Sequence, residues 1–349
     1  MATTGAGSRT VLAWIWLGVG AAMVLVPVWL GWTRWQAVLT GHPLTLAVSI
    51  GSLLVGFVAL AWAVATLILG DRSEGEDGPR RRTERQRRRR ARWRVVFAVP
   101  ALLACVLVVG ALAWSRPLPA SPTALAAMRS GGDVRVTDRL TWYEMIPVAR
   151  NSKGVLIRPR TGLIFVPGAR VDPRAYAQVL RPLAEAGYLV AVLKEPFGIA
   201  LADARHAARV IDVHPEIAQW VVGGHSLGGV AAAAFAQDTA EVGGAPVAGL
   251  VLFASYPAGT VDRAGLKVTS ISGDRDGLTT PEDIAASGPR LPADTVSVVI
   301  PGAVHSFFGD YGEQRGDGTP TVDRATAQRD IAEATKALLA SVTPPPKKK

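Results

Sequence analysis

The chain has a single cysteine, Cys105, in 349 residues, and this scarcity limits the chemistry it can hold. One thiol cannot form a disulfide within the chain, and it cannot supply a cysteine-rich metal cluster. A fold stabilised by internal disulfides is therefore excluded, and so is a metal cluster bound by several cysteines.

The C-terminal two thirds lack an excess of positive charge, although the whole chain carries a formal net charge of +10. Residues 71–94 hold eleven arginines against five acidic residues, which accounts for +6 of the total. From residue 115 onward there are 25 basic and 23 acidic residues. This balance is not typical of a globule that binds nucleic acid through its charge, so no nucleic-acid partner is expected.

Three long stretches contain no charged residue in their interior: residues 11–32, 44–70 and 95–114. Each is close to the roughly 20 residues that a helix needs to cross the hydrocarbon core of a bilayer. A soluble core has no need of three such runs, so we expect three transmembrane helices rather than buried globular helices. The first run is too long for a cleaved signal peptide and two more follow it, so we interpret it as a retained anchor. Tryptophans fall mostly near the ends of these runs, as in Trp14, Trp16, Trp29, Trp32, Trp35, Trp62, Trp93 and Trp114.

The distribution of arginine predicts the orientation of these helices. The loop 34–43 has one arginine, whereas the loop 71–94 has eleven, and loops rich in Lys and Arg stay in the cytoplasm. We therefore expect a multi-pass protein of the cell membrane in which everything after Trp114 is extracytoplasmic. The arginine run could instead bind nucleic acid or anionic lipid, but it needs no partner to set the topology.

The chain divides by composition into four parts. Residues 1–114 form the expected membrane domain, residues 115–122 a stiff proline-containing linker, residues 123–342 a globular domain, and residues 343–349 a disordered tail. In the globular part, short apolar runs alternate with helical ones, which predicts an α/β fold with a mostly parallel sheet covered by helices on both faces. The expected strands are 134–137, 142–148, 155–158, 163–166, 188–193, 220–222, 249–254, 267–271 and 295–300, and the expected helices include 173–186, 202–213 and 324–341.

The strongest chemical signal is the sequence G-H-S-L-G at residues 224–228, a G-x-S-x-G motif between an expected strand and an expected helix. A nucleophilic serine in this motif sits on a sharp, strained turn, and the flanking glycines let neighbouring backbone approach. The helix that begins at Leu227 would point its N–H groups at a developing oxyanion. We therefore expect Ser226 to be a nucleophile; the alternative is a tight turn with an incidental serine.

A serine nucleophile needs a histidine base that is oriented by a carboxylate. Of five histidines, only His305 lies in a loop at the end of an expected strand and after a suitable acid. Asp274 and Asp276 both follow the strand 267–271, and we prefer Asp276 because its position past Gly273 gives it the better reach. The chain order Ser, Asp, His is typical of α/β-hydrolases.

A second oxyanion donor is expected in the loop that follows the strand 163–166. The backbone N–H of Ala169 is the candidate, with the N–H of Leu227 as its partner, and Gly168 is small enough to let a substrate approach. Alternatively, Pro167 and Gly168 form only a turn.

Four stretches together resemble a bacterial α/β-hydrolase family related to the dienelactone-hydrolase-like members. They are L-I-F-V-P-G-A-R-V-D-P-R-A-Y from residue 163, V-V-G-G-H-S-L-G-G from 221, S-G-D-R-D-G-L from 272 and H-S-F-F-G-D-Y-G from 305. The resemblance covers about residues 124–339, and it implies Ser226 as nucleophile, Asp276 as acid and His305 as base. The chain departs from dienelactone hydrolases proper in having Ser where those have Cys, so their substrate does not carry over.

Only about a dozen residues, 255–266, separate two late strands at a point where such enzymes often insert a helical lid. We therefore expect an open pocket lined by Phe197, Tyr256, Phe307 and Phe308. Lys194 and Glu195, at the end of another strand, either contact substrate or form a surface salt bridge.

Together these features predict a membrane-anchored serine hydrolase that cleaves a carboxylic ester or thioester of a small-molecule or lipid-like acyl substrate. Membrane lipids are its other expected partner, and no metal or organic cofactor is expected. An acyltransferase that uses the same triad and a non-catalytic binding module are the alternatives.

Overall fold

A computed structural model describes residues 4–69, 84–148, 156, 158–203 and 205–345. The chain divides into two compact units. The N-terminal unit comprises residues 1–38 and 44–116, and the C-terminal unit comprises residues 39–43 and 117–349. Most of the arginine-rich loop expected at 71–94, half of the strand expected at 155–158 and the last four tail residues lie outside the described residues.

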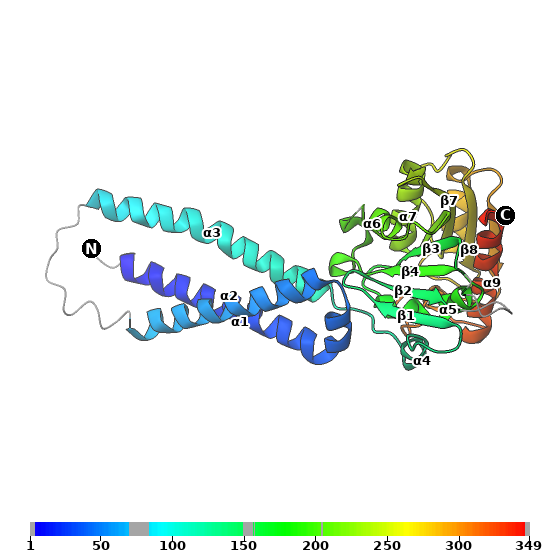
Figure 1. The fold of residues 1–349 in the computed structure, drawn as a ribbon. Coiled ribbons are helices and arrows are strands. Elements are labelled where there is room, and N and C mark those ends of the chain that lie inside the picture. Colours follow the sequence, from blue (N-terminus) through cyan, green and yellow to red (C-terminus); the bar gives the residue numbers. More distant parts are fainter. Residues whose placement is uncertain (1–3, 70–83, 149–155, 157, 204, 346–349) are drawn as a thin grey trace. The chain divides into compact units, whose positions relative to one another are not determined.

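The N-terminal unit consists of the helices α1 (Thr4–Thr40), α2 (Pro43–Leu69) and α3 (Glu84–Trp114) (Figure 1). Their stretches Thr10–Thr40, Pro43–Leu69 and Val96–Trp114 are long and apolar enough to cross a membrane. The helix α1 extends through most of the loop expected at 34–43, and its backbone leaves helical geometry only at Arg34.

Small residues let α1 and α2 approach each other closely. A Cβ atom at Gly20 would lie only 3.1 Å from the carbonyl oxygen of Gly56, and one at Gly56 only 2.9 Å from the Val24 side chain, so neither position leaves room to spare. Ser52 Oγ donates a hydrogen bond to the carbonyl of Met23 at 2.9 Å. Large apolar side chains on other faces, such as Val58 and Leu107, are more than two thirds exposed. This combination of small residues at the helix contact and apolar residues outside is typical of helices in lipid.

The C-terminal unit is built on one sheet with the strand order β1-β2-β4-β3-β5-β7-β8-β9. The strands β3, β4, β5, β7, β8 and β9 run parallel, β1 and β2 are antiparallel at one end, and β6 pairs antiparallel with the start of β7. This is the mostly parallel sheet that the sequence predicts. The strands are β1 (Val134–Asp138), β2 (Trp142–Pro147), β3 (Thr161–Val166), β4 (Leu189–Leu193), β5 (Gln219–His225), β6 (Glu241–Val242), β7 (Ala245–Phe253), β8 (Lys267–Gly273) and β9 (Val296–Ile300).

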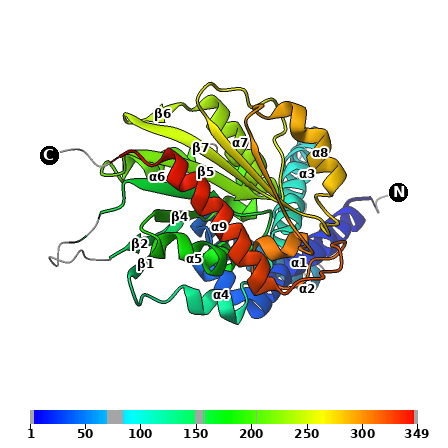
Figure 2. The ribbon, with the colours of Figure 1, turned by 90° about the vertical axis from the view of Figure 1, so that its right-hand side faces the viewer.

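Helices cover both faces of this sheet (Figure 2). They are α4 (Pro122–Ala127), α5 (Ala177–Glu185), α6 (His206–Asp212), α7 (Leu227–Asp238), α8 (Pro281–Ser287) and α9 (Arg324–Val342). The helix expected at 173–186 is divided into a 3-10 turn, Pro173–Tyr176, and α5. The helix α8 was not expected, although Thr280 begins it with a reciprocal capping box to Asp283.

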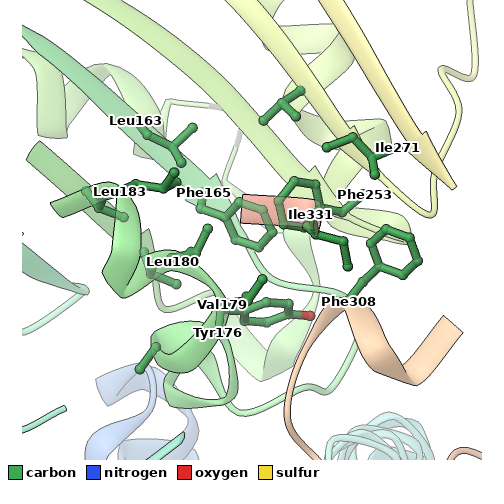
Figure 3. Close-up of a cluster of buried hydrophobic side chains, with 14 of the residues drawn as sticks. Leu163, Phe165, Tyr176, Val179, Leu180, Leu183, Phe253, Ile271, Phe308 and Ile331 are labelled. Atoms are coloured by element: carbon green, nitrogen blue, oxygen red, sulfur yellow. The ribbon is translucent and has the colours of Figure 1, made fainter. Parts of the chain in front are cut away.

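Alternate side chains of the buried strand β3 belong to different cores. Leu163 and Phe165 pack with residues of α5 and α9, as Figure 3 shows for Leu180 and Ile331, whereas Ile164 packs in a second cluster with residues of α6 and α7. Because every residue of β3 is buried, its residues from Leu163 to Val166 are all apolar and do not alternate with polar ones. The parallel strands are thereby fixed between two helix layers, and their carboxyl ends meet along one edge.

A buried ion network joins β2 to the segment between α6 and β5. The side chain of Glu144 on β2 is fully buried, and its Oε2 lies 2.8 Å from Nε2 of His214, outside good hydrogen-bond alignment. His214 Nδ1 lies 2.9 Å from Oε1 of Glu216. Burial lowers the pKa of His214, but the two carboxylates outweigh burial and the pKa is raised. Burial likewise opposes ionisation of Glu144, but the neighbouring His214 and Arg139 side chains outweigh burial and leave the pKa of Glu144 lowered.

Stability should therefore depend on the protonation of His214. Because its pKa is raised on folding, its ion pairs stabilise the fold below the unfolded value of about 6.5, and this contribution is lost as the pH rises through the raised pKa. We expect His214→Asn to reduce the free energy of unfolding by about 1–2 kcal/mol more at pH 6 than at pH 9. Denaturant unfolding at the two pH values measures the difference. The same loss at both would contradict the prediction, and Glu216→Gln should show a weaker form of the pH dependence.

Candidate active site

Ser226 sits on the turn between β5 and α7 in a backbone conformation that a serine rarely adopts, with φ 53° and ψ −125°. Its N–H donates to the carbonyl of Phe253 at 3.0 Å. Its own carbonyl accepts the N–H groups of Gly229 and Val230 and, at 2.7 Å, the hydroxyl of Ser255. Such strain persists only where the surroundings fix it, and here the hydrogen bonds on both sides of the residue do so.

The glycines of the motif are required by close approach of backbone rather than by the serine itself. A Cβ atom on Gly224 would collide with the backbone of Gly228, and a Cβ atom on Gly228 would collide with the carbonyls of Val166 and Pro167. The start of α7 therefore packs closely against the end of β5, which precedes it, and against the end of β3. This contact brings the loop after β3 close to the turn that carries Ser226.

His305 and Asp276, far apart in the sequence, form a buried pair. His305 Nδ1 lies 2.8 Å from Asp276 Oδ2, and the other oxygen of Asp276 accepts the N–H groups of Leu278 and Thr279 at 2.8 and 2.7 Å. Asp274 is exposed and accepts the N–H of Gly302 at 2.6 Å instead. The geometry therefore favours Asp276 over Asp274 as the group that orients the imidazole.

The His305 ring lies beside the turn that carries Ser226. Its centroid is 4.5 Å from that of His225, the residue before the serine. Among the described residues, Ser226 Oγ makes no hydrogen bond to His305. Hydrogen bonds between catalytic groups are often long before a substrate binds. The lack of a Ser226–His305 hydrogen bond is therefore compatible with Ser226 as a nucleophile and His305 as its base.

A histidine–carboxylate pair is not unique to this place. His206 and Glu195 form another buried pair, 3.2 Å apart, and His214 pairs with two carboxylates as described above. Lys194 is also buried and bonds Asp138 at 2.6 Å, so neither Lys194 nor Glu195 lies at the surface. What distinguishes His305 is its position next to a strained serine turn.

The two expected oxyanion donors are available for a ligand. Within the part of the chain that the structure describes, the N–H groups of Ala169 and Leu227 donate no hydrogen bond. Leu227 is the first residue of α7, so its N–H has no partner within the helix and the helix dipole favours negative charge there.

The N–H of Gly168 is already bonded, since it donates to the hydroxyl of Tyr176 at 2.9 Å. That hydroxyl also lies 2.9 Å from Nδ1 of His225. The volume that a side chain at residue 168 would need is occupied by His225 and Tyr176, which explains the glycine without reference to a substrate. Burial, followed by the charge of His305, lowers the pKa of His225 well below its ordinary value, so His225 stays neutral at neutral pH.

Sequence reasoning missed two residues that hold this arrangement. Tyr176 fixes Gly168 and His225, and Asp317 accepts the N–H groups of His305 and Ser306 at 3.0 and 2.8 Å. The Asp-Gly pair at residues 317 and 318 predicts a turn. Nothing in the sequence indicates that the carboxylate in this turn contacts the backbone of His305. Both side chains accept backbone N–H groups of another loop, and Tyr176 also contacts the His225 ring, so neither belongs to a sequence motif.

The residues expected to line the pocket differ in exposure. Phe308 is fully buried among core aromatics, and Phe307 is nearly so, with the Arg324 guanidinium 4.5 Å from its ring centroid. Phe197 and Tyr256 remain partly exposed. Only the latter two therefore have appreciable surface to offer a ligand. Among the described residues, no group of three or more His, Cys, Asp or Glu side chains is placed to hold a metal ion.

Comparison with known proteins identifies the domain. Residues 162–329 match the family model described as alpha/beta hydrolase family, and no curated protein sequence matches the chain. Similar solved structures include TT1662 from Thermus thermophilus, with 16% identity, a TM-score of 0.42 and coverage of 60% of this chain and 99% of the other. A thermophilic esterase, Est2, from Thermogutta terrifontis has 18% identity and a TM-score of 0.42, over 63% of this chain and 95% of the other. An α/β hydrolase enzyme from the Lake Arreo metagenome in Spain has 15% identity and a TM-score of 0.45, over 62% and 86%. The sheet order described above and the family match together show that the C-terminal unit has the α/β-hydrolase fold and contains an alpha/beta hydrolase family domain.

Proposed function

We propose that the protein is a membrane-anchored serine hydrolase that cleaves carboxylic esters or thioesters. The observation that carries this proposal is the strained turn at Ser226 with the buried His305–Asp276 pair beside it. All three residues follow the carboxyl ends of parallel strands, where α/β sheets bind their ligands. The resemblance to dienelactone-hydrolase-like proteins remains part of the proposal, with Ser226 at the position of their cysteine.

In the proposed mechanism, Ser226 Oγ attacks the acyl carbonyl carbon while Nε2 of His305 accepts the hydroxyl proton. Asp276 accepts the Nδ1–H of His305, and it stabilises the imidazolium that forms. The N–H groups of Ala169 and Leu227 donate to the tetrahedral oxyanion, and the positive end of the α7 dipole supports them. His305 then protonates the leaving alcohol or thiol, and the C–O or C–S bond breaks to give an acyl-enzyme.

Water, deprotonated by His305, attacks the acyl-enzyme and releases the acid. Phe197 and Tyr256 are the proposed substrate contacts that keep exposed surface, and Gly168 and Phe307 are proposed to contribute only at the margin because each is largely enclosed. These aromatic surfaces suit a small-molecule or lipid-like acyl group. Transfer of the acyl group to an alcohol would use the same residues. Hydrolysis and acyl transfer are therefore distinguished by their products, a free acid in the first case and a new ester in the second.

Labelling with a fluorophosphonate tests whether Ser226 is an activated nucleophile. We expect the full chain in detergent to form a covalent adduct at Ser226, and we expect Ser226→Ala to form none. Ser297→Ala is the matched control, because Ser297 is an exposed serine on β9 and has no part in this proposal. Equal labelling of the wild type and Ser226→Ala, or none of either, would leave a non-catalytic binding module as the better description.

The two aspartates of the loop after β8 offer a second test. Asp276→Asn should lower kcat for a nitrophenyl ester by about 10³–10⁴-fold, because the amide no longer holds the required tautomer of His305. Asp274→Asn should keep kcat within about threefold, since Asp274 bonds only backbone at Gly302. Steady-state kinetics with graded chain lengths measure both variants. An opposite ranking would assign the acid to Asp274.

The proposed location is a cell membrane, with the hydrolase domain on the extracytoplasmic side. The three apolar helices support insertion, and the arginine-rich loop supports the orientation. An alkaline phosphatase fused after Leu118 should be active, since this reporter folds only after export, and a fusion after residue 82 should be inactive. The reverse pattern of reporter activity would overturn the orientation.

A further inference from the structure

The segment that joins α3 to the C-terminal unit is hydrogen-bonded to the loop after β3. The N–H of Leu118 donates to the carbonyl of Arg170 at 2.7 Å, and the carbonyl of Leu118 accepts the N–H of Asp172 at 2.9 Å. Leu118 and Val171 thus form a short parallel β-bridge. Residues 117–121, which composition alone describes as a stiff linker, therefore add a strand-like edge to the loop that carries Ala169.

The backbone around Ala169 is held on both sides while its own N–H stays available. On one side the N–H of Gly168 donates to Tyr176, and on the other the N–H of Arg170 donates to the carbonyl of Gly198 at 3.0 Å. Arg170 has a φ of 61°, a left-handed conformation that a non-glycine residue keeps only under constraint. The bond from Leu118 to the Arg170 carbonyl is one of those constraints.

The same segment is also bonded to the loop that carries His305. The N–H of Ser121 donates to the carbonyl of Asp310 at 2.8 Å, and the N–H of Asp310 donates to the carbonyl of Ala175 at 2.8 Å. The N–H of Ala120 lies 3.5 Å from a carboxylate oxygen of Asp172, a residue that is itself buried. The segment 117–121 consequently connects the loop of the oxyanion donor with the loop of the histidine.

We propose that residues 117–121 are a positioning element of the active site, and that Leu118 acts through its backbone to aim the N–H of Ala169 at the oxyanion. This inference rests on the proposed hydrolase function. An oxyanion donor contributes only when it lies about 2.7–3.1 Å from the developing charge, so a small shift of the loop weakens the transition state more than substrate binding. A domain that begins at residue 122 would lack this element and should be a poorer catalyst than the full chain.

The matched variants Leu118→Pro and Leu118→Ala test this role in the full chain in detergent. Proline removes the N–H that bonds Arg170 but keeps the carbonyl, whereas alanine keeps both and removes only the side chain. We expect Leu118→Pro to lower kcat about 10–100-fold with KM within about threefold, as partial loss of an oxyanion donor would. Leu118→Ala should keep kcat within about threefold. Melting temperatures show whether either variant has lost its global fold.

A double-mutant cycle separates positioning from general damage. Residues 168–171 form a turn closed by the N–H of Val171 and the carbonyl of Gly168, and the positive φ at its third residue is the pattern of a type II turn. Such turns accept proline at the second position, so Ala169→Pro deletes the donor while the turn remains. If Leu118 acts through Ala169, adding Leu118→Pro to Ala169→Pro should reduce kcat less than twofold further.

Hydrogen exchange keeps the inference testable without catalysis. Deuterium uptake over residues 168–172 should rise in Leu118→Pro and stay unchanged in Leu118→Ala. Unchanged uptake and unchanged kcat in Leu118→Pro, with Ser226→Ala inactive, would overturn the positioning role and leave the proposed function intact. Fully additive losses in the cycle would also overturn it. If the wild type neither hydrolyses esters nor takes up the phosphonate probe, the proposed function fails, and the exchange result alone decides whether the segment holds the loop.

Discussion

The whole candidate site depends on one close packing contact, between the start of α7 and the carboxyl end of β3. Gly224 and Gly228 permit it because any side chain there would collide with backbone. At this contact Ser226 has a positive φ, and within the described part of the chain the N–H of Leu227 donates no hydrogen bond. The contact also brings the loop of Ala169 beside the serine, so one steric constraint gathers the proposed nucleophile and both proposed oxyanion donors.

His305 is the candidate base because of where it lies, and not because it pairs with a carboxylate. Buried carboxylates hold His206, His214 and His305 alike, and such pairs stabilise folds as readily as they serve catalysis. Of these three histidines, only His305 lies against the turn that carries Ser226, and its backbone N–H donates a hydrogen bond to Asp317. His225, which is fully buried and neutral, lies 2.9 Å through its Nδ1 from the Tyr176 hydroxyl that accepts the N–H of Gly168.

The boundary between the apolar helices and the α/β-hydrolase unit is less sharp than composition suggests. Prolines in the segment 115–122 indicate a spacer, yet Leu118 and Ser121 are bonded to two loops of the site. These hydrogen bonds are made by backbone N–H and carbonyl groups, which every residue except proline carries in full. The sequence therefore contains no signal for them. The segment that follows α3 is thus also the segment that bonds the loop of Ala169.

The sequence by itself determined the three apolar helices, most of the order of strands and helices, and the turn at Ser226, because each depends on local periodicity or on residues adjacent in the chain. It also favoured Asp276 over Asp274 by reach along one loop. It did not indicate β6 or α8. Only the tertiary structure showed the hydrogen bonds that Tyr176, Asp317 and Leu118 make, because these bonds join separate loops of the folded chain. For the same reason Phe308, expected at the pocket, lies in the core: the side on which an aromatic residue packs is set by the neighbouring elements, which local sequence does not specify.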